Sequence, residues 1–187
     1  MTTPRDFGLL ALRLGIGGTL AAHGTQKLFG WFGGAGLDKT AATFEHIGFR
    51  PGKLNAIAAG LGEAGGGALL AACLGSPGAG AAIAGTMIVA SSMHTNNGFF
   101  STNGGFELPA VLGASAVALT LTGPGTLSID HALGHRLNQP WMRSLALMTV
   151  VPAAFAVIAR RRRAATATAA NVSTPAQPPS PDAEQSS

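Results

Sequence analysis

The stretch LNAIAAGLGEAGGGALLAACL, Leu54–Leu74, contains a single charged residue, Glu63, close to its centre. About 20 predominantly apolar residues are enough for a helix to cross the hydrocarbon core of a bilayer. A charged group at the centre of such a helix costs about 2.5–3.5 kcal/mol on insertion scales. The stretch therefore predicts a transmembrane helix, and Glu63 is predicted to be a functional residue with a polar partner on another helix.

Uncharged sequence continues on the C-terminal side of Glu63. Neither Ala64–Phe106 nor Leu108–Ile129 contains Asp, Glu, Lys or Arg. The whole chain is 47% hydrophobic and 11% charged, whereas a soluble domain carries about 25% charged residues. This composition predicts an all-α, multi-pass transmembrane bundle in the cell membrane, with the lipid bilayer as its first partner.

The apolar runs divide residues 1–143 into a four-helix membrane core. The four predicted spans are Asp6–Phe29, Lys53–Leu74, Ala79–Thr95 and Phe106–Thr122. Between the first two spans, Asp38–Glu45 has the pattern of a short interfacial helix, with Asp38 as its N-cap. After the fourth span, Ser128–Leu137 is predicted to form a short amphipathic helix capped by Ser128.

The C-terminal part is predicted to add a fifth helix, within residues 144–163, and a polar tail. The apolar segment Leu145–Ala159 is short for a span and contains Pro152, but it ends at the basic run Arg160–Arg163, which is typical of a stop signal. Residues 164–187 are too poor in apolar side chains to fold. Because most of the basic residues then lie on one side, the tail is expected in the cytoplasm; without a fifth span the orientation stays open.

Several charges and histidines are predicted to meet near one end of the bundle. An Arg13–Glu63 pair is the simplest way to bury both charges; alternatively Arg13 snorkels to the head groups and Glu63 is protonated. The imidazoles of His23 and His94 and the carboxylate of Glu107 are expected at one membrane level, where they could relay protons or hold a polar head group. Alternatively, they form hydrogen bonds that cap the backbone of the loops. The pocket candidates are Arg13, His23, Lys27, Glu63, His94 and Glu107.

Other conspicuous residues are interpreted as structural. The glycine cluster Gly60–Gly67 is predicted to pack helices closely, as small-xxx-small patterns do. His131 and His135 are expected at the surface. No metal site is expected, since no local ligand spacing such as HExxH exists, and Cys73, the only cysteine, cannot form an intramolecular disulfide. The net charge of +4 comes largely from the arginine run, so no nucleic-acid partner is expected.

An ordered set of motifs resembles the DoxX family of small membrane proteins. The run HGTQKLFGWFGG at His23–Gly34 carries the strongest likeness. The accompanying matches are Thr40-Ala41, Phe44-Glu45, the Gly60–Gly67 stretch around Glu63, His94, Asn97–Phe100, Gly104–Glu107 and Gly123–Gly125. The resemblance implies a four-helix membrane bundle, to which the fifth segment and the tail are additions.

The resemblance also implies an association with redox work. Some relatives are subunits of a thiosulfate:quinone oxidoreductase, and others anchor complexes with a superoxide dismutase and a sulfurtransferase during thiol and oxidative stress. Some related redox membrane proteins carry paired cysteines, which this chain lacks, so autonomous thiol redox activity is not implied. Soluble enzymes of these kinds are the expected partners, recruited through the loop candidates Trp31, Phe32, Asn97, Phe99 and Phe100.

Three functions are compatible with the sequence. The leading hypothesis is a membrane subunit of an oxidoreductase system linked to oxidative stress or sulfur compounds, rather than an autonomous enzyme, with a quinone head group or a small sulfur species in its pocket. The second is a proton-coupled carrier or channel that uses Glu63 as its titrating group. The third is a non-catalytic scaffold for soluble enzymes. A homo-oligomer is compatible with each of them.

Overall fold

The computed structural model describes residues 2–173, and side chains for residues 2–167. All regular elements in this part of the chain are helical, which confirms the all-α prediction. The seven α-helices are α1 (Pro4–Phe29), α2 (Gly36–His46), α3 (Gly52–Ala72), α4 (Ser76–His94), α5 (Glu107–Thr122), α6 (Ile129–Ala132) and α7 (Pro140–Ser173). Three short 3₁₀ turns, Trp31–Gly33, Thr95–Asn97 and Ser101–Asn103, lie in the connections.

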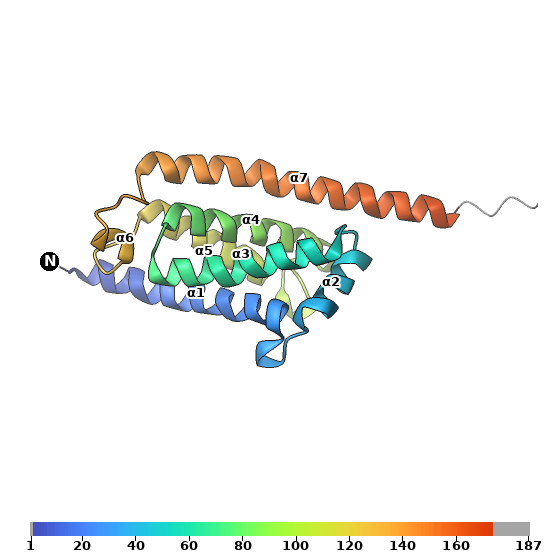
Figure 1. Cartoon of the computed structure of the whole chain (residues 1–187), viewed down its shortest axis with the longest axis horizontal. Helices are drawn as coiled ribbons and strands as arrows, with labels where there is room; N and C mark the ends of the chain where they lie inside the picture. The colour runs from blue at the N-terminus through green and yellow to red at the C-terminus, as the bar shows by residue number, and fades with distance from the viewer. Residues whose placement is uncertain (1, 174–187) are drawn as a thin grey trace, which may run out of the picture.

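Four long helices, α1, α3, α4 and α5, form an up-and-down bundle (Figure 1). Helix α1 packs mainly on α3, α3 also packs on α4, and α4 packs on α5. Helix α7 lies along the outside of the bundle, mainly against α4. The short α6 and α2 lie at opposite ends of the bundle (Figure 1). The four predicted core spans therefore coincide with helices that pack as one bundle.

Glycines set the close approach of α1 to α3. A Cβ added at Gly67 would lie 2.6 Å from the carbonyl oxygen of Gly17, and one added at Gly24 would collide with the backbone of Ala64. On the other face of α3, Gly62 and Gly66 lie against side chains of α4. Small residues at such contacts let helix backbones approach closely, so the predicted packing role is confirmed for Gly60, Gly62, Gly66 and Gly67, whereas a Cβ at Gly65 would meet nothing within 4 Å.

Two predicted short elements differ from the structure. Helix α2 begins at Gly36, so Asp38 lies in its first turn and is not the N-cap. Ser128 caps α6 as predicted, by accepting a 3.1 Å hydrogen bond from the backbone N–H of His131, but α6 ends at Ala132 rather than near residue 137. The early end has a local cause, because Gly134 and His135 both adopt positive φ angles.

Helix α7 is longer than the predicted fifth segment. It begins at Pro140 and continues through Pro152 and the arginine run to Ser173, beyond Ala164, where the polar tail was predicted to start. Residues 174–187 of that predicted tail lie outside the described residues. By length and composition, Pro140–Ala167 is the one helix among residues 2–173 that could cross a membrane, and only 11% of its most apolar window is buried. The abundant glycines of α3 and α4 and the charges of α1 lower the hydropathy of the other long helices.

Candidate functional site

A pocket between α1, α3, α4 and α5 brings four of the six pocket candidates together. It has a volume of about 110 Å³ and lies toward the α2 end of the bundle. Its polar lining consists of His23, Lys27, Glu63 and His94. Its apolar lining consists of Leu20, Met87, Ala90, Leu108, Pro109 and Leu112. The sequence singled out the polar residues only, because nothing in a run of Leu, Met and Ala distinguishes a pocket wall from ordinary packing.

An ion pair between Lys27 and Glu63 joins α1 to α3 at this pocket. The Glu63 side chain is 4% exposed and the Lys27 side chain is 28% exposed, so the pair is buried on the carboxylate side and open on the ammonium side. The predicted polar partner of Glu63 therefore exists, but it is Lys27. Buried charges are stable only when they are paired, so the pair accounts for a carboxylate in the middle of an apolar helix.

The predicted Arg13–Glu63 pair is wrong. Arg13 is 2% exposed and donates instead to the backbone carbonyl groups of Pro124 and Leu127, in the loop after α5. The register of α1 on α3 explains the difference: Gly17 lies against Gly67, so Arg13, one turn earlier, lies beyond Gly67 toward the far end of α3. Glycine spacing in the two antiparallel helices could have revealed this register from the sequence.

The two pocket histidines come from different helices. His23 lies on α1, one turn before Lys27, and His94 is the last residue of α4. The Nδ1 atom of His94 is 2.8 Å from the carbonyl oxygen of Gly104, which also accepts a 3.1 Å hydrogen bond from the Asn97 side chain. This contact orients the imidazole ring of His94 and ties the pocket to the loop between α4 and α5.

Glu107 does not line the pocket. Its carboxylate accepts a 2.9 Å hydrogen bond from the backbone N–H of Ser101 and thereby closes the loop before α5. The alternative interpretation, a polar group that caps loop backbone, therefore applies to Glu107. His94 also contacts loop backbone, but it lines the pocket together with His23, Lys27 and Glu63.

Four of the five loop candidates are exposed aromatic side chains. Trp31, Phe32, Phe99 and Phe100 are 58%, 73%, 46% and 61% exposed. They come from the α1–α2 and α4–α5 connections. Each connection follows a helix that contributes a histidine to the pocket, His23 from α1 and His94 from α4. Both connections lie at the same end of the bundle, since His23 and His94 line one pocket.

A second polar cluster at the opposite end is structural. Asp130 is fully buried and accepts hydrogen bonds from the backbone N–H groups of Gly75 and Ser76, at 2.8 and 3.0 Å, and from the Ser76 hydroxyl at 2.6 Å. Asn138 donates to the same carboxylate at 3.3 Å. Asp130 therefore caps the first turn of α4, a role that its sequence position in a polar loop did not indicate. The prediction that His131 lies at the surface is confirmed.

The fold and the pocket together define a small helical bundle with a buried ion pair and an apolar exterior. The DoxX family model of membrane proteins matches residues 8–96, which confirms the resemblance over this part of the chain. The match includes His23, Lys27, Glu63 and His94. No curated protein and no solved structure matches the chain.

Proposed function

We propose that this protein is a multi-pass membrane subunit of an oxidoreductase system, and that its pocket binds a small polar redox molecule such as a quinone head group or a small sulfur species. The observation that carries the proposal is the Lys27–Glu63 pair at the wall of a pocket whose other walls are two histidines and apolar side chains. With such a pocket, a DoxX-like membrane protein would supply a binding site to the system. It has no pair of cysteines for thiol redox chemistry of its own.

The distribution of side chains supports four core spans in addition to α7. Charged groups are buried inside the bundle, with Arg13 at 2% and Glu63 at 3% exposure. Large apolar side chains point outward along the long helices, which is unfavourable in water and favourable in lipid. The outward-facing apolar residues include Phe7, Leu14, Leu54, Leu61, Leu69, Val111, Leu121, Leu145, Met148 and Phe155.

The pocket chemistry suits a planar, partly apolar molecule with carbonyl or sulfur–oxygen acceptors. Lys27 supplies an N–H donor at the open side of the pair, and the imidazoles of His23 and His94 supply ring nitrogens that donate or accept hydrogen bonds. Leu20, Met87 and Leu112 supply an apolar wall. Ligand sites commonly combine apolar walls with a few placed polar groups in this way.

Direct ligand binding tests the proposal. The purified full chain in lipid nanodiscs is titrated with a short-chain ubiquinone analogue and, separately, with thiosulfate. Wild-type protein is expected to bind one of the two saturably, and the double variant Glu63→Gln/Lys27→Met is expected to lose that binding. Glu107→Gln is the matched control, since it removes a carboxylate outside the pocket and should bind normally. Failure of wild-type protein to bind either ligand, or equal binding by the double variant, would contradict the proposal.

A proton-coupled carrier is less well supported. The buried residues Leu20, Leu70, Ile83 and Leu119 form a continuous apolar core next to the pocket, toward the Arg13 end. A transport path through the bundle would have to open this core. Proton-coupled flux in liposomes that Glu63→Gln removes would nevertheless favour the carrier over a subunit.

A scaffold role is compatible with the main proposal, and the exposed aromatic loops favour it. Large apolar patches on a surface often mark contacts with other proteins or with membranes. Trp31→Ala and Phe99→Ala should release a soluble partner enzyme in pull-down experiments, while Glu63→Gln should retain it. Retention of the partner by both loop variants would argue against recruitment through these loops.

A further inference from the structure

An apolar groove runs between α3 and α7, separate from the pocket described above. Helix α7 packs on α4 and only slightly on α5, which leaves a space of about 230 Å³ open beside α3. Its walls are almost entirely apolar or small. Residues contributing to them include Ala58 and Ala59 of α3, Gly85 and Val89 of α4, and Val150, Ala153 and Val157 of α7.

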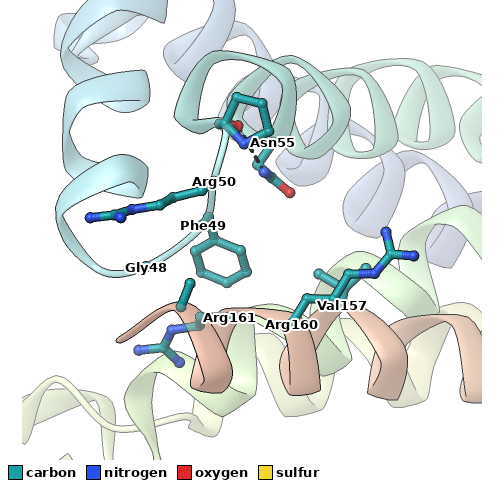
Figure 2. Close-up of a pocket in the computed structure, with 9 residues that line it drawn as sticks. Gly48, Phe49, Arg50, Asn55, Val157, Arg160 and Arg161 are labelled. Atoms are coloured by element: carbon teal, nitrogen blue, oxygen red, sulfur yellow. Dashed lines mark hydrogen bonds between the residues drawn. The ribbon is translucent and has the colours of Figure 1, made fainter. Parts of the chain in front are cut away.

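A basic cavity continues the groove at its α2 end. This cavity, of about 190 Å³, shares Phe49, Asn55 and Val157 with the groove and adds three arginines, Arg50, Arg160 and Arg161. Figure 2 shows Phe49 at its centre, with Arg50 extending from the turn before α3 and the other two arginines extending from α7. The two cavities therefore form one site that is apolar along its length and cationic at its mouth.

Two of the arginines already have protein partners. Arg161 donates to the backbone carbonyl oxygen of Ile47 at 3.0 Å, and its guanidinium lies 5.3 Å from the centre of the Phe49 ring. Arg50 lies 3.5 Å from the Glu45 carboxylate, with both side chains about half exposed. Arg160 is exposed at the rim. Glu45 offsets one of the three positive charges, so the mouth keeps a net positive charge.

The helical spacing of α7 places the site on one face. Val157, Arg160, Arg161 and Ala164 line the cavity and follow the i, i+3, i+4, i+7 pattern. Arg162 and Arg163, in the same basic run, do not line it. From Val150 to Arg160 the helix rises about 15 Å at 1.5 Å per residue, which equals half of the roughly 30 Å hydrocarbon core of a bilayer.

We infer that the groove between α3 and α7 holds an anionic phospholipid, with its head group at the cationic rim that includes Arg50 and Arg160 and an acyl chain along the apolar walls. The length of the groove matches one leaflet, and the charge at its mouth complements the head group. Basic pockets between transmembrane helices on the cytoplasmic side bind anionic head groups by the same physics. The lipid would fill the space that α7 leaves open and attach it to α3.

The arrangement fits a lipid better than a free anion. The guanidinium groups surround Phe49 at the rim and do not converge on one point (Figure 2). A small anion would need converging donors for tight binding, because its binding energy comes from the phosphate group alone. A head group held in place by its acyl chain needs only the partial neutralisation that rim arginines provide.

Native mass spectrometry of the full chain, stripped of lipid in detergent and then mixed with phosphatidylglycerol or phosphatidylcholine, tests the inference. Wild-type protein is expected to retain one phosphatidylglycerol molecule in preference to phosphatidylcholine. Arg160→Gln and Arg50→Gln should each weaken this retention roughly fivefold, as expected for about one basic contact. Arg163→Gln is the matched control, since it removes the same charge from the same run but outside the cavity.

A second variant and a competitor make the test specific. Ala58→Leu should fill the groove and reduce retention of phosphatidylglycerol while leaving every arginine in place. Inorganic phosphate should not displace the lipid. Equal retention of the two lipids by wild-type protein, equal losses in Arg160→Gln and Arg163→Gln, unchanged retention in Ala58→Leu, or displacement by phosphate would each overturn the inference. Circular dichroism of every variant confirms that the helices are intact.

Discussion

Lys27 of α1 and Glu63 of α3 form an ion pair that is nearly closed to solvent at the carboxylate and open at the ammonium. The register that brings them together is set by glycines, because Gly17 and Gly24 lie against Gly67 and Ala64. The same pair lines the pocket with His23 and His94. The packing of α1 on α3 therefore also sets the chemistry of the pocket, because the Lys27–Glu63 pair lies at the contact between these two helices.

Removal of one partner from this pair should destabilise the bundle. Glu63→Gln is expected to lower the free energy of unfolding by about 1 kcal/mol, because the Lys27 ammonium that it leaves without a partner is 28% exposed and water partly replaces the carboxylate. The double variant Glu63→Gln/Lys27→Met should recover most of that loss. Thermal unfolding in one detergent measures both. Lys27→Met alone completes the comparison: a loss in the double variant equal to the sum of the two single losses would mean that the ion pair contributes nothing beyond its separate side chains.

The glycine contact predicts opposite effects at two positions of α1. Gly24→Ala should destabilise the protein by about 2 kcal/mol, since overpacking of a close helix contact costs about that much. Gly18→Ala should be neutral or slightly stabilising, because a Cβ at Gly18 meets nothing within 4 Å and alanine favours helix. Unfolding curves of the two variants give the comparison. Equal effects at Gly24 and Gly18 would contradict the register of α1 on α3.

Arg13 is predicted to be structural and not part of the ligand site. Arg13→Met removes the donor to the carbonyl groups of Pro124 and Leu127, and hydrogen bonds of charged groups contribute about 1.5–3 kcal/mol each. We expect reduced thermal stability with unchanged ligand affinity in the fraction that folds. Arg136→Met, at an exposed arginine, serves as the control. Loss of ligand binding in folded Arg13→Met would extend the site toward this end of the bundle.

Asp130 should make stability sensitive to acid. Burial raises its pKa, but the hydrogen bonds from Ser76 and Gly75 lower it more, so the pKa of Asp130 lies below its ordinary value of 3.8. The stabilisation is therefore fully present above about pH 4 and is lost as the pH falls toward the lowered pKa. The difference in unfolding temperature between wild type and Asp130→Asn should shrink below about pH 4. A difference that stays constant to about pH 3 would show that the charge of Asp130 is not what stabilises the cap.

Much of the core could be predicted from charge and glycine patterns. The apolar runs located α1, α3, α4 and α5 within a few residues, because each run ends at a polar or glycine-rich connection. The sequence also identified Glu63, His23, Lys27 and His94 as pocket residues. The partner of Glu63 was predicted incorrectly. A helical wheel of α1 shows that Arg13 and Lys27 lie on the same face, but it does not show which of them lies level with Glu63 on α3.

Features that depend on contacts between distant segments could not be predicted. The role of Asp130 depends on the meeting of the loop after α5 with the start of α4, which no local pattern encodes. The length of α7 also exceeded the prediction, because Pro152 and the arginines were expected to end or bend a helix that continues through both. The groove beside α7 follows from its one-sided packing on α4.

The proposed role as a redox subunit is best tested by purification of the full chain through a C-terminal tag in a mild detergent, followed by mass spectrometry of bound proteins and small molecules. Wild-type protein is expected to recover a soluble oxidoreductase, a sulfurtransferase or a quinone in stoichiometric amount. The quinone should be lost in Glu63→Gln/Lys27→Met but not in Glu107→Gln. Recovery of the bare bundle, alone or as a homo-oligomer, would contradict a role as a redox subunit.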